Sequence, residues 1–172
     1  MVIYCFSFFL IYTNILVTIA TFGVEINNSS INSKNNSTFY SSFNSYVLSY
    51  PEGYGSYLTQ NSSTFHKNDT ILLYLEPIGF SYKPIKDSTG NTLFLINFGI
   101  DVLISNNNGD LLERIENIAT KEIVSYHKNK EVYLIIEFKP QNLKSGKYYF
   151  QYFISDKNSG KNFEVVKDII IL

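Results

Sequence analysis

The stretch EVYLIIEFKPQNLKSGKYYFQYFISDKNSGKNFEVVKDIII, residues 131–171, carries the clearest fold signal in this sequence. It contains three runs dominated by β-branched and aromatic residues, which favour β-strands because such side chains pack well on a half-buried pleated surface. Pro140 ends the first run, and a polar segment containing Gly160 separates the last two, so we expect a final hairpin. The three predicted strands are 131–138, 148–155 and 163–171.

A local motif precedes the second of these strands. Leu143, Gly146 and Tyr148 form the pattern Leu-x-x-Gly-x-Tyr. It resembles the tyrosine corner of immunoglobulin-like and fibronectin type III domains, in which a Tyr hydroxyl bonds to the backbone a few residues upstream. An ordinary Gly turn before a Tyr-rich strand is the alternative.

The same alternation of strand and turn signals continues upstream. A long extended run is expected to bend near Gly99 and to end in a tight turn at residues 106–109. No amphipathic helix follows residue 24, so we predict an all-β antiparallel sandwich of the immunoglobulin or fibronectin type III kind over residues 45–172. The further predicted strands are an edge strand 46–50, a strand 70–76 ended by Pro77, the long run 92–105, and strands 111–115 and 121–126.

The first 24 residues contain no Asp, Glu, Lys or Arg. As a hydrophobic helix they would span roughly 36 Å, enough to cross a bilayer core of about 30 Å. We therefore predict a signal peptide, cleaved after Ala20 or Gly23, or an uncleaved membrane anchor; a buried core helix is the alternative. No Lys or Arg precedes the apolar run, which leaves cleavage open. In either case the rest of the chain is expected to be extracytoplasmic, secreted or anchored to the cell membrane.

The segment 25–44 is a predicted polar linker with too little apolar surface to fold alone. Asn-x-Ser/Thr patterns crowd in and after it, and their position behind a leader makes glycosylation a reasonable expectation, although such short patterns also arise by chance. The possible acceptors are Asn27, Asn28, Asn35, Asn36, Asn61 and Asn68.

Composition limits the classes of partner. With 45% apolar and 17% charged residues the chain is typical of a globular protein, and its net charge of −1 gives no overall basic excess to attract nucleic acid or anionic lipid. The single cysteine, Cys5, lies in the leader, so we expect no disulfide in the mature domain.

The sequence contains no recognisable catalytic motif, and neither a metal nor another cofactor is expected. The only histidines, His66 and His127, are far apart, and a blue-copper site would also need a cysteine and usually a methionine outside the leader. The loop 106–110 does not fit a calcium loop, because aligning Gly109 with its invariant Gly puts Ile104 in the first ligand position. A secreted hydrolase that uses carboxylates is the rival hypothesis, with Glu76, Asp101 and Glu137 as candidates.

Four tyrosines suggest a contact surface: Tyr46, Tyr50, Tyr54 and Tyr57. Such rings form stacking platforms for sugars or for an apolar patch on a partner, although they also commonly close one end of a core. The leading hypothesis is a non-catalytic interaction or accessory module of the cell envelope. Its partners would be the membrane through an uncleaved leader and an envelope protein or glycan. A purely structural envelope protein is a third possibility.

Three segments support a family resemblance: NDTILLYLEPIGF (68–80), SYHKNKE (125–131) and DKNSGKNF (156–163). They resemble exported proteins of unknown function from ammonia-oxidising archaea, over residues 46–172. Asn68 and Ser145 depart from the Gly and Pro expected at those positions in that family. The resemblance implies an exported location and a sandwich architecture, and it brings no activity and no functional residues.

Overall fold

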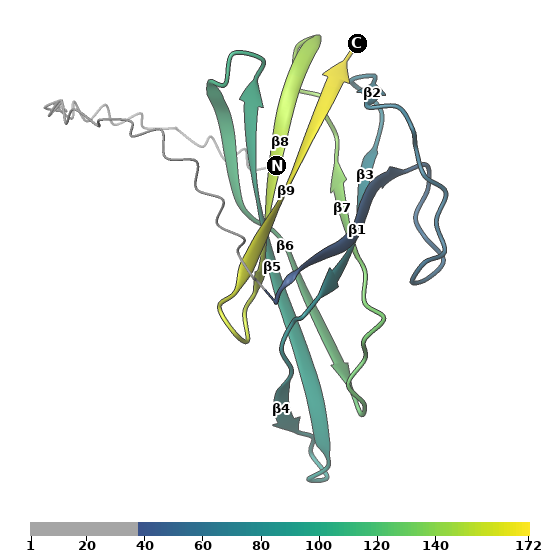
Figure 1. Ribbon diagram of the computed structural model, residues 1–172, viewed down its shortest axis with the longest axis vertical. Helices are drawn as coiled ribbons and strands as arrows, with labels where there is room; N and C mark the ends of the chain where they lie inside the picture. The colour runs from purple at the N-terminus through teal and green to yellow at the C-terminus, as the bar shows by residue number, and fades with distance from the viewer. Residues whose placement is uncertain (1–37) are drawn as a thin grey trace, which may run out of the picture. The chain divides into compact units, whose positions relative to one another are not determined.

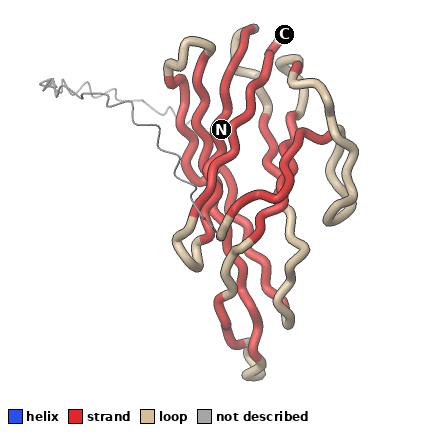
Figure 2. Tube along the Cα trace, viewed as in Figure 1, coloured by secondary structure: helices blue, strands red, loops and turns tan. Residues whose placement is uncertain are grey.

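The computed structural model describes residues 38–172, and within this range every regular element is a β-strand (Figures 1 and 2). Strands of alternating inward apolar and outward polar residues recur along this part of the chain, as expected for β-sheets with one buried face. The strands are β1 (Tyr40–Val47), β2 (Thr64–Phe65), β3 (Ile71–Ile78), β4 (Lys83–Lys86), β5 (Thr92–Asn106), β6 (Leu111–Ser125), β7 (Leu134–Phe138), β8 (Gly146–Asp156) and β9 (Asn162–Ile171).

The described strands form two sheets, so the predicted all-β sandwich is confirmed at this level. The smaller sheet has the order β1-β3-β7 and is antiparallel throughout. In the larger sheet β2, β9, β8 and β5 are neighbours, and only the short β2 runs parallel to its partner β9. Strand β5 pairs with β6 along one edge and with β4 and then β8 along the other.

The core lies between the two sheets and follows from the period-two pattern of the strands. On β5, Ile96, Phe98 and Ile100 point inward and are at most 1% exposed. They meet Phe150 and Ile154 of β8, which are fully buried. Burying each such side chain contributes roughly 1.5–3 kcal/mol, so this apolar layer is the main stabilising element of the sandwich.

The predicted turn chemistry is confirmed at two places. The Tyr148 hydroxyl donates a hydrogen bond of 2.8 Å to the Lys144 carbonyl, as the Leu-x-x-Gly-x-Tyr pattern predicted. The β5–β6 hairpin turns at residues 106–109, where the Gly109 N–H donates to the Asn106 carbonyl over 3.0 Å and Gly109 has a φ of 87°.

Several strand boundaries differ from the prediction. The predicted strand 131–138 begins only at Leu134, and the short strands β2 and β4 were not predicted. Strand β6 is continuous. Residues 116–118 have no partner in the register, but Ile115 and Ala119 on either side of them pair with β5, so Asn117, at a φ of 52°, lies in a bulge that does not end the strand. Strand β3 passes through Pro77, which lies opposite a register shift in β1 where the missing N–H costs no regular ladder bond. Strand β1 begins at Tyr40, and buried Phe39 joins the core, so the last residues of the predicted linker belong to the sandwich.

The predicted N-terminal helix, residues 1–24, lies outside the described residues. Within residues 38–172 no helix is long and apolar enough to cross a membrane.

Candidate binding cleft

A cleft of about 470 Å³ opens between β6 at the edge of the larger sheet and the segment leading into β7 at the edge of the smaller one. Core residue Ile100 reaches its base, so the cleft opens onto the layer between the sheets. The larger sheet contributes Ala119, Thr120, Lys121 and Ile123. The other flank is formed by Asn129 and residues 131–133 of the segment that leads into β7, and by Leu134 and Ile135 of β7 itself. Tyr50 and Pro51 complete the lining.

Each flank of the cleft includes a strand edge that has no partner strand within residues 38–172. Within the described residues β7 pairs only with β3, and β6 pairs only with β5. Residues 130–133, which lead into β7, belong to no ladder. Unpaired strand edges offer N–H and C=O groups to an incoming chain, so this site can bind extended backbone as well as side chains.

The lining combines apolar and polar groups. Ala119, Ile123, Val132 and Leu134 supply the apolar part, and the last two are almost fully buried. Polar groups come from Thr120, Lys121, Asn129 and Glu131. An apolar base with a few polar groups is the usual composition of a ligand site.

A loop that we call the strap, residues 48–60, returns along β1 and packs on the outer face of the smaller sheet; Figure 2 draws it as part of the tan loop between β1 and β2. Its ends are held by the Leu48 N–H, which donates to Leu58, and by the Gln60 N–H, which donates to Tyr46, over 2.9 and 2.8 Å. The Tyr57 ring packs on Phe43 and Tyr74 at centroid distances of 4.9 and 4.4 Å.

The Tyr74 hydroxyl connects the strap to the sheet. It accepts a hydrogen bond of 3.0 Å from the Gly55 N–H and donates one of 2.7 Å to Glu76 Oε1. Burial raises the pKa of Tyr74 above its ordinary value, so the hydroxyl keeps its proton and remains a donor.

The mouth of the cleft is fixed by an exposed hydrogen bond. The Tyr50 hydroxyl donates to Glu137 Oε2, and Lys139 Nζ lies 3.3 Å from the other carboxylate oxygen. The bond raises the pKa of Tyr50 and, together with Lys139, lowers the pKa of Glu137. Tyr50 is thereby held at the cleft while 59% of the residue stays exposed.

The four tyrosines predicted as a contact surface are not all on one face. Tyr46 is 6% exposed and packs edge-on against Phe65 in the core, so its assignment to a surface is wrong. The reason is strand parity: Tyr46 lies opposite Leu73, whose side chain points inward. Tyr57 belongs to the strap and packs its ring against the smaller sheet, so of the four only Tyr50 and Tyr54 are exposed.

The three carboxylates of the rival hydrolase hypothesis are not brought together. Glu137 pairs with Leu72, four residues from Glu76 along β3, which is roughly 13 Å and longer than the 5–9.5 Å between glycosidase carboxylates. Asp101 lies in the other sheet, where its Oδ1 accepts a hydrogen bond of 2.7 Å from the Asn117 N–H.

The remaining predicted positions lie in turns and loops. The His66 N–H donates to Asp69 in a tight turn, and within the described residues no group of three or more His, Cys, Asp or Glu could hold a metal ion. Asn61 and Asn68 are exposed and lie outside the strands. The other four possible glycosylation sites, Asn27, Asn28, Asn35 and Asn36, lie outside the described residues.

The cleft itself was not predicted from the sequence. Its walls come from strands that are far apart along the chain, and its presence depends on which sheet receives β6. The only local signal is the polar run 127–131, which lies between β6 and β7 and has no strand pattern, and therefore indicates an unpaired segment there. No protein-family model matches this chain, and no curated protein matches it in sequence.

Proposed function

We propose that this chain is a non-catalytic extracytoplasmic interaction module. In this proposal an immunoglobulin-like sandwich binds an extended peptide segment of an envelope protein in the cleft between β6 and β7. The observation that carries the proposal is the cleft itself, about 470 Å³ in volume and bounded by two strand edges that are unpaired in the described part of the chain.

The strand order supports the immunoglobulin-like assignment. Without the short β2 and β4, seven strands remain, and the first, second and fifth form one sheet while the third, sixth and seventh lie in the other, as in immunoglobulin domains. The fourth, β6, lies beside the third, an arrangement found in fibronectin type III domains. The Tyr148 bond at the start of the sixth strand supports the same assignment.

The same strand order explains why the cleft exists. In constant-type immunoglobulin domains the fourth strand pairs with the fifth and covers its edge. Here β6 pairs with β5 instead, so no strand among residues 38–172 covers the second edge of β7. An added peptide strand would take the position of that missing neighbour, with backbone hydrogen bonds supplying affinity and the apolar base selecting side chains.

Export is supported by the uncharged residues 1–24 and by the resemblance to exported archaeal proteins. Mass spectrometry of the native protein tests this part. Loss of residues 1–20, glycans on the candidate asparagines, or recovery of the intact chain in the membrane fraction would support export or anchoring. An intact, unmodified chain in the cytosolic fraction would contradict it.

The binding site is tested with a displayed library of random dodecapeptides, selected on the full-length chain in mild detergent. Ala119→Phe fills the cleft and should weaken binding of the selected peptides about tenfold or more. Val166→Phe on β9, where Val166 is 56% exposed, is the matched control and should leave binding unchanged. Bound peptide should also slow hydrogen exchange at residues 130–136.

The proposal fails if no peptide is selected, if both variants bind equally well, or if protection falls elsewhere on the sandwich. Thermal unfolding of both variants shows whether either substitution has damaged the fold itself.

A further inference from the structure

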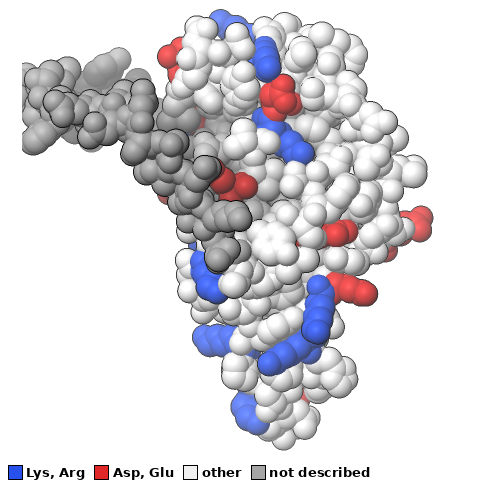
Figure 3. Space-filling view, in the orientation of Figure 1, with Lys and Arg blue, Asp and Glu red and all other residues white. Residues whose placement is uncertain are grey.

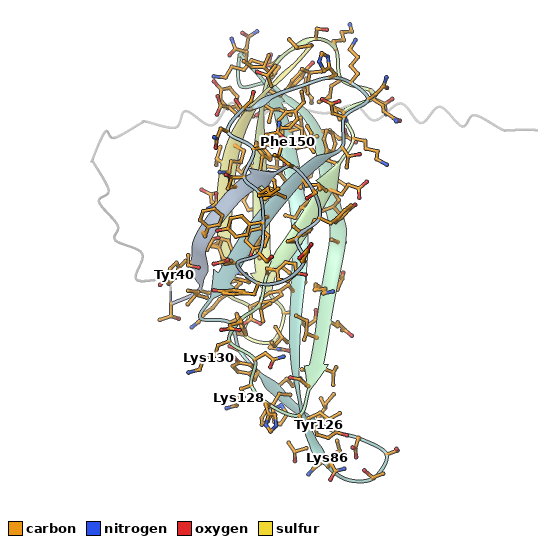
Figure 4. All side chains as sticks on the ribbon, turned by 90° about the vertical axis from the view of Figure 1, so that its right-hand side faces the viewer. Tyr40, Lys86, Tyr126, Lys128, Lys130 and Phe150 are labelled. Carbon is orange, nitrogen blue, oxygen red and sulfur yellow. The ribbon has the colours of Figure 1, made fainter. Side chains whose placement is uncertain are left out.

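One end of the sandwich carries an excess of lysine. Lys83 and Lys86 lie on β4, and Lys128 and Lys130 on the loop after β6, with the exposed Tyr126 beside them; we call this set the lysine tip. Figure 3 shows basic side chains gathered at the β4 end, and Figure 4 shows Lys86, Tyr126, Lys128 and Lys130 along that same end. The chain's net charge of −1 therefore hides a local excess of positive charge.

Strand pairing brings these residues together from two distant parts of the chain. Lys86 pairs with Thr92 and Lys83 with Leu95, which sets β4 along one edge of the start of β5. Phe94 pairs with Ser125 on the other edge, so the loop that begins at Tyr126 leaves from the same place. The two pairs of lysines thus flank the first residues of β5.

Aromatic rings support the loop. Lys128 Nζ lies 5.5 Å from the Tyr82 ring centroid and 5.3 Å from that of Phe94. The Tyr82 hydroxyl donates a hydrogen bond of 2.7 Å to the Asn129 carbonyl, and Phe80 connects Tyr82 to the core. The lysines of this loop are therefore presented by an anchored backbone rather than a free one.

The tip lysines have no carboxylate partner. None of them takes part in a salt bridge within residues 38–172. Asp87, the acidic residue in the β4–β5 turn, has both carboxylate oxygens occupied by Thr89 and Asn91. Lys86 donates to Gly90 and Thr92, which are neutral acceptors. The neighbouring carboxylates Asp87 and Glu131 offset two of the four lysine charges, so a local excess of about +2 remains.

We propose that the lysine tip binds an acidic polysaccharide. The positive charges are spread over two elements, as suits a chain of repeated carboxylates or sulfates, and Tyr126, 63% exposed, offers a flat ring to a sugar. The exposed apolar side chains at this end are few: Tyr126 and Val124, the latter 50% exposed and paired with Leu95, lie near the lysines. One short aliphatic side chain is much less than the apolar face with which a protein segment inserts into a bilayer. Neither the four lysines nor Tyr126 lines the cleft, although their neighbours Asn129 and Glu131 do. The two proposals therefore rest on different side chains, and peptide binding and polysaccharide binding are measured separately.

The test measures binding of the full-length chain, in mild detergent, to immobilised polygalacturonate, with neutral dextran as a blank. Binding should weaken between about 50 and about 150 mM salt. The double variant Lys83→Glu/Lys130→Glu reverses two charges of the tip. These two lysines have no hydrogen-bond or ion-pair partner within the described residues, so the change should leave the fold intact. It should weaken polygalacturonate binding about tenfold or more. Lys67→Glu with Lys144→Glu makes the same change of net charge away from the tip and should weaken it less than about twofold.

Tyr126→Ala should weaken polygalacturonate binding severalfold without changing its salt dependence, because the ring carries no charge. Double-stranded DNA is tested alongside, and phosphatidylglycerol vesicles are tested after removal of the detergent, which would dissolve them. The inference is overturned if polygalacturonate does not bind at low salt, if both charge-reversal variants lose binding equally, or if the tip substitutions weaken binding to vesicles or DNA as much as binding to the polysaccharide.

Discussion

Gly79 follows β3 and packs against the segment that enters β1. Its φ of 80° is disfavoured for other residues, and a Cβ added there would overlap the Thr38 carbonyl oxygen. Gly79→Ala should therefore lower the free energy of unfolding by about 3 kcal/mol or more, from combined conformational strain and steric overlap. Urea denaturation of the two proteins measures this difference.

Gly90→Ala is the matched control for Gly79→Ala. Gly90 has a similar φ of 86°, but a Cβ there would meet no atom within 4 Å. This control should cost only about 1 kcal/mol. Equal losses at the two glycines would show that the contact with Thr38 is unimportant.

At the scale of single residues, a hydrogen bond between near neighbours in sequence was predictable, and one between distant residues was not. The bond of Tyr148 was predictable because its donor and acceptor are four residues apart. Asp156 was not: this fully buried carboxylate accepts hydrogen bonds from the Ser159 hydroxyl nearby and from the Ser81 N–H, 75 residues away. From the sequence alone, Asp156 was only the first residue of a polar hairpin.

At the scale of an element, the strap should respond to acid. The pKa of Glu137 is lowered in the folded protein, chiefly by the Tyr50 bond, so that bond is favoured above the ordinary Glu pKa of about 4.3 and is lost as pH falls through the lower folded value. Tyr50 has a raised pKa, so its proton is retained at neutral pH. The Tyr50 ring signals in NMR should be constant from about pH 5 to 8 and shift below about pH 4.

Two comparisons isolate the Tyr50–Glu137 bond. Glu137→Gln removes the titrating group and should abolish the acid shift of Tyr50. Tyr126, exposed and far along the chain, should show no such step in the unmodified protein. An acid shift of Tyr50 that persists in the Gln variant would assign it to another group.

Strand existence was more predictable than strand pairing. The apolar alternation of β5, β8 and β9 is strong enough to identify each strand alone. The continuity of β6 was not predictable, because residues 116–118 form a bulge that is kept in the strand by the paired residues on either side of it rather than by its own composition. Tertiary packing, and not the local sequence, determines that β6 joins the larger sheet, and the cleft exists because of that pairing.

At the scale of the whole domain, two apolar clusters lie on opposite faces of the smaller sheet. One is the core between the sheets, and the other lies under the strap around Val47, Leu72 and Tyr74. Composition gives the total number of apolar residues but not their division between the two clusters. In the same way, the net charge of −1 does not reveal the lysine tip. The division into clusters follows from strand parity, since neighbouring residues on β3 point to different faces.

Adjacent leucines on β3 allow the two clusters to be separated experimentally. Leu73 is fully buried in the core and Leu72 is 5% exposed beneath the strap. Leu73→Ala should cost about 2–5 kcal/mol of global stability, because no disulfide is available in residues 38–172 to offset a cavity in the core.

Leu72→Ala removes the same atoms, but the strap above it can detach while both sheets stay paired. Its global cost should be smaller, with hydrogen exchange accelerated in residues 48–60. Equal global losses, without faster exchange in the strap, would mean that strap and sandwich unfold as one cooperative unit.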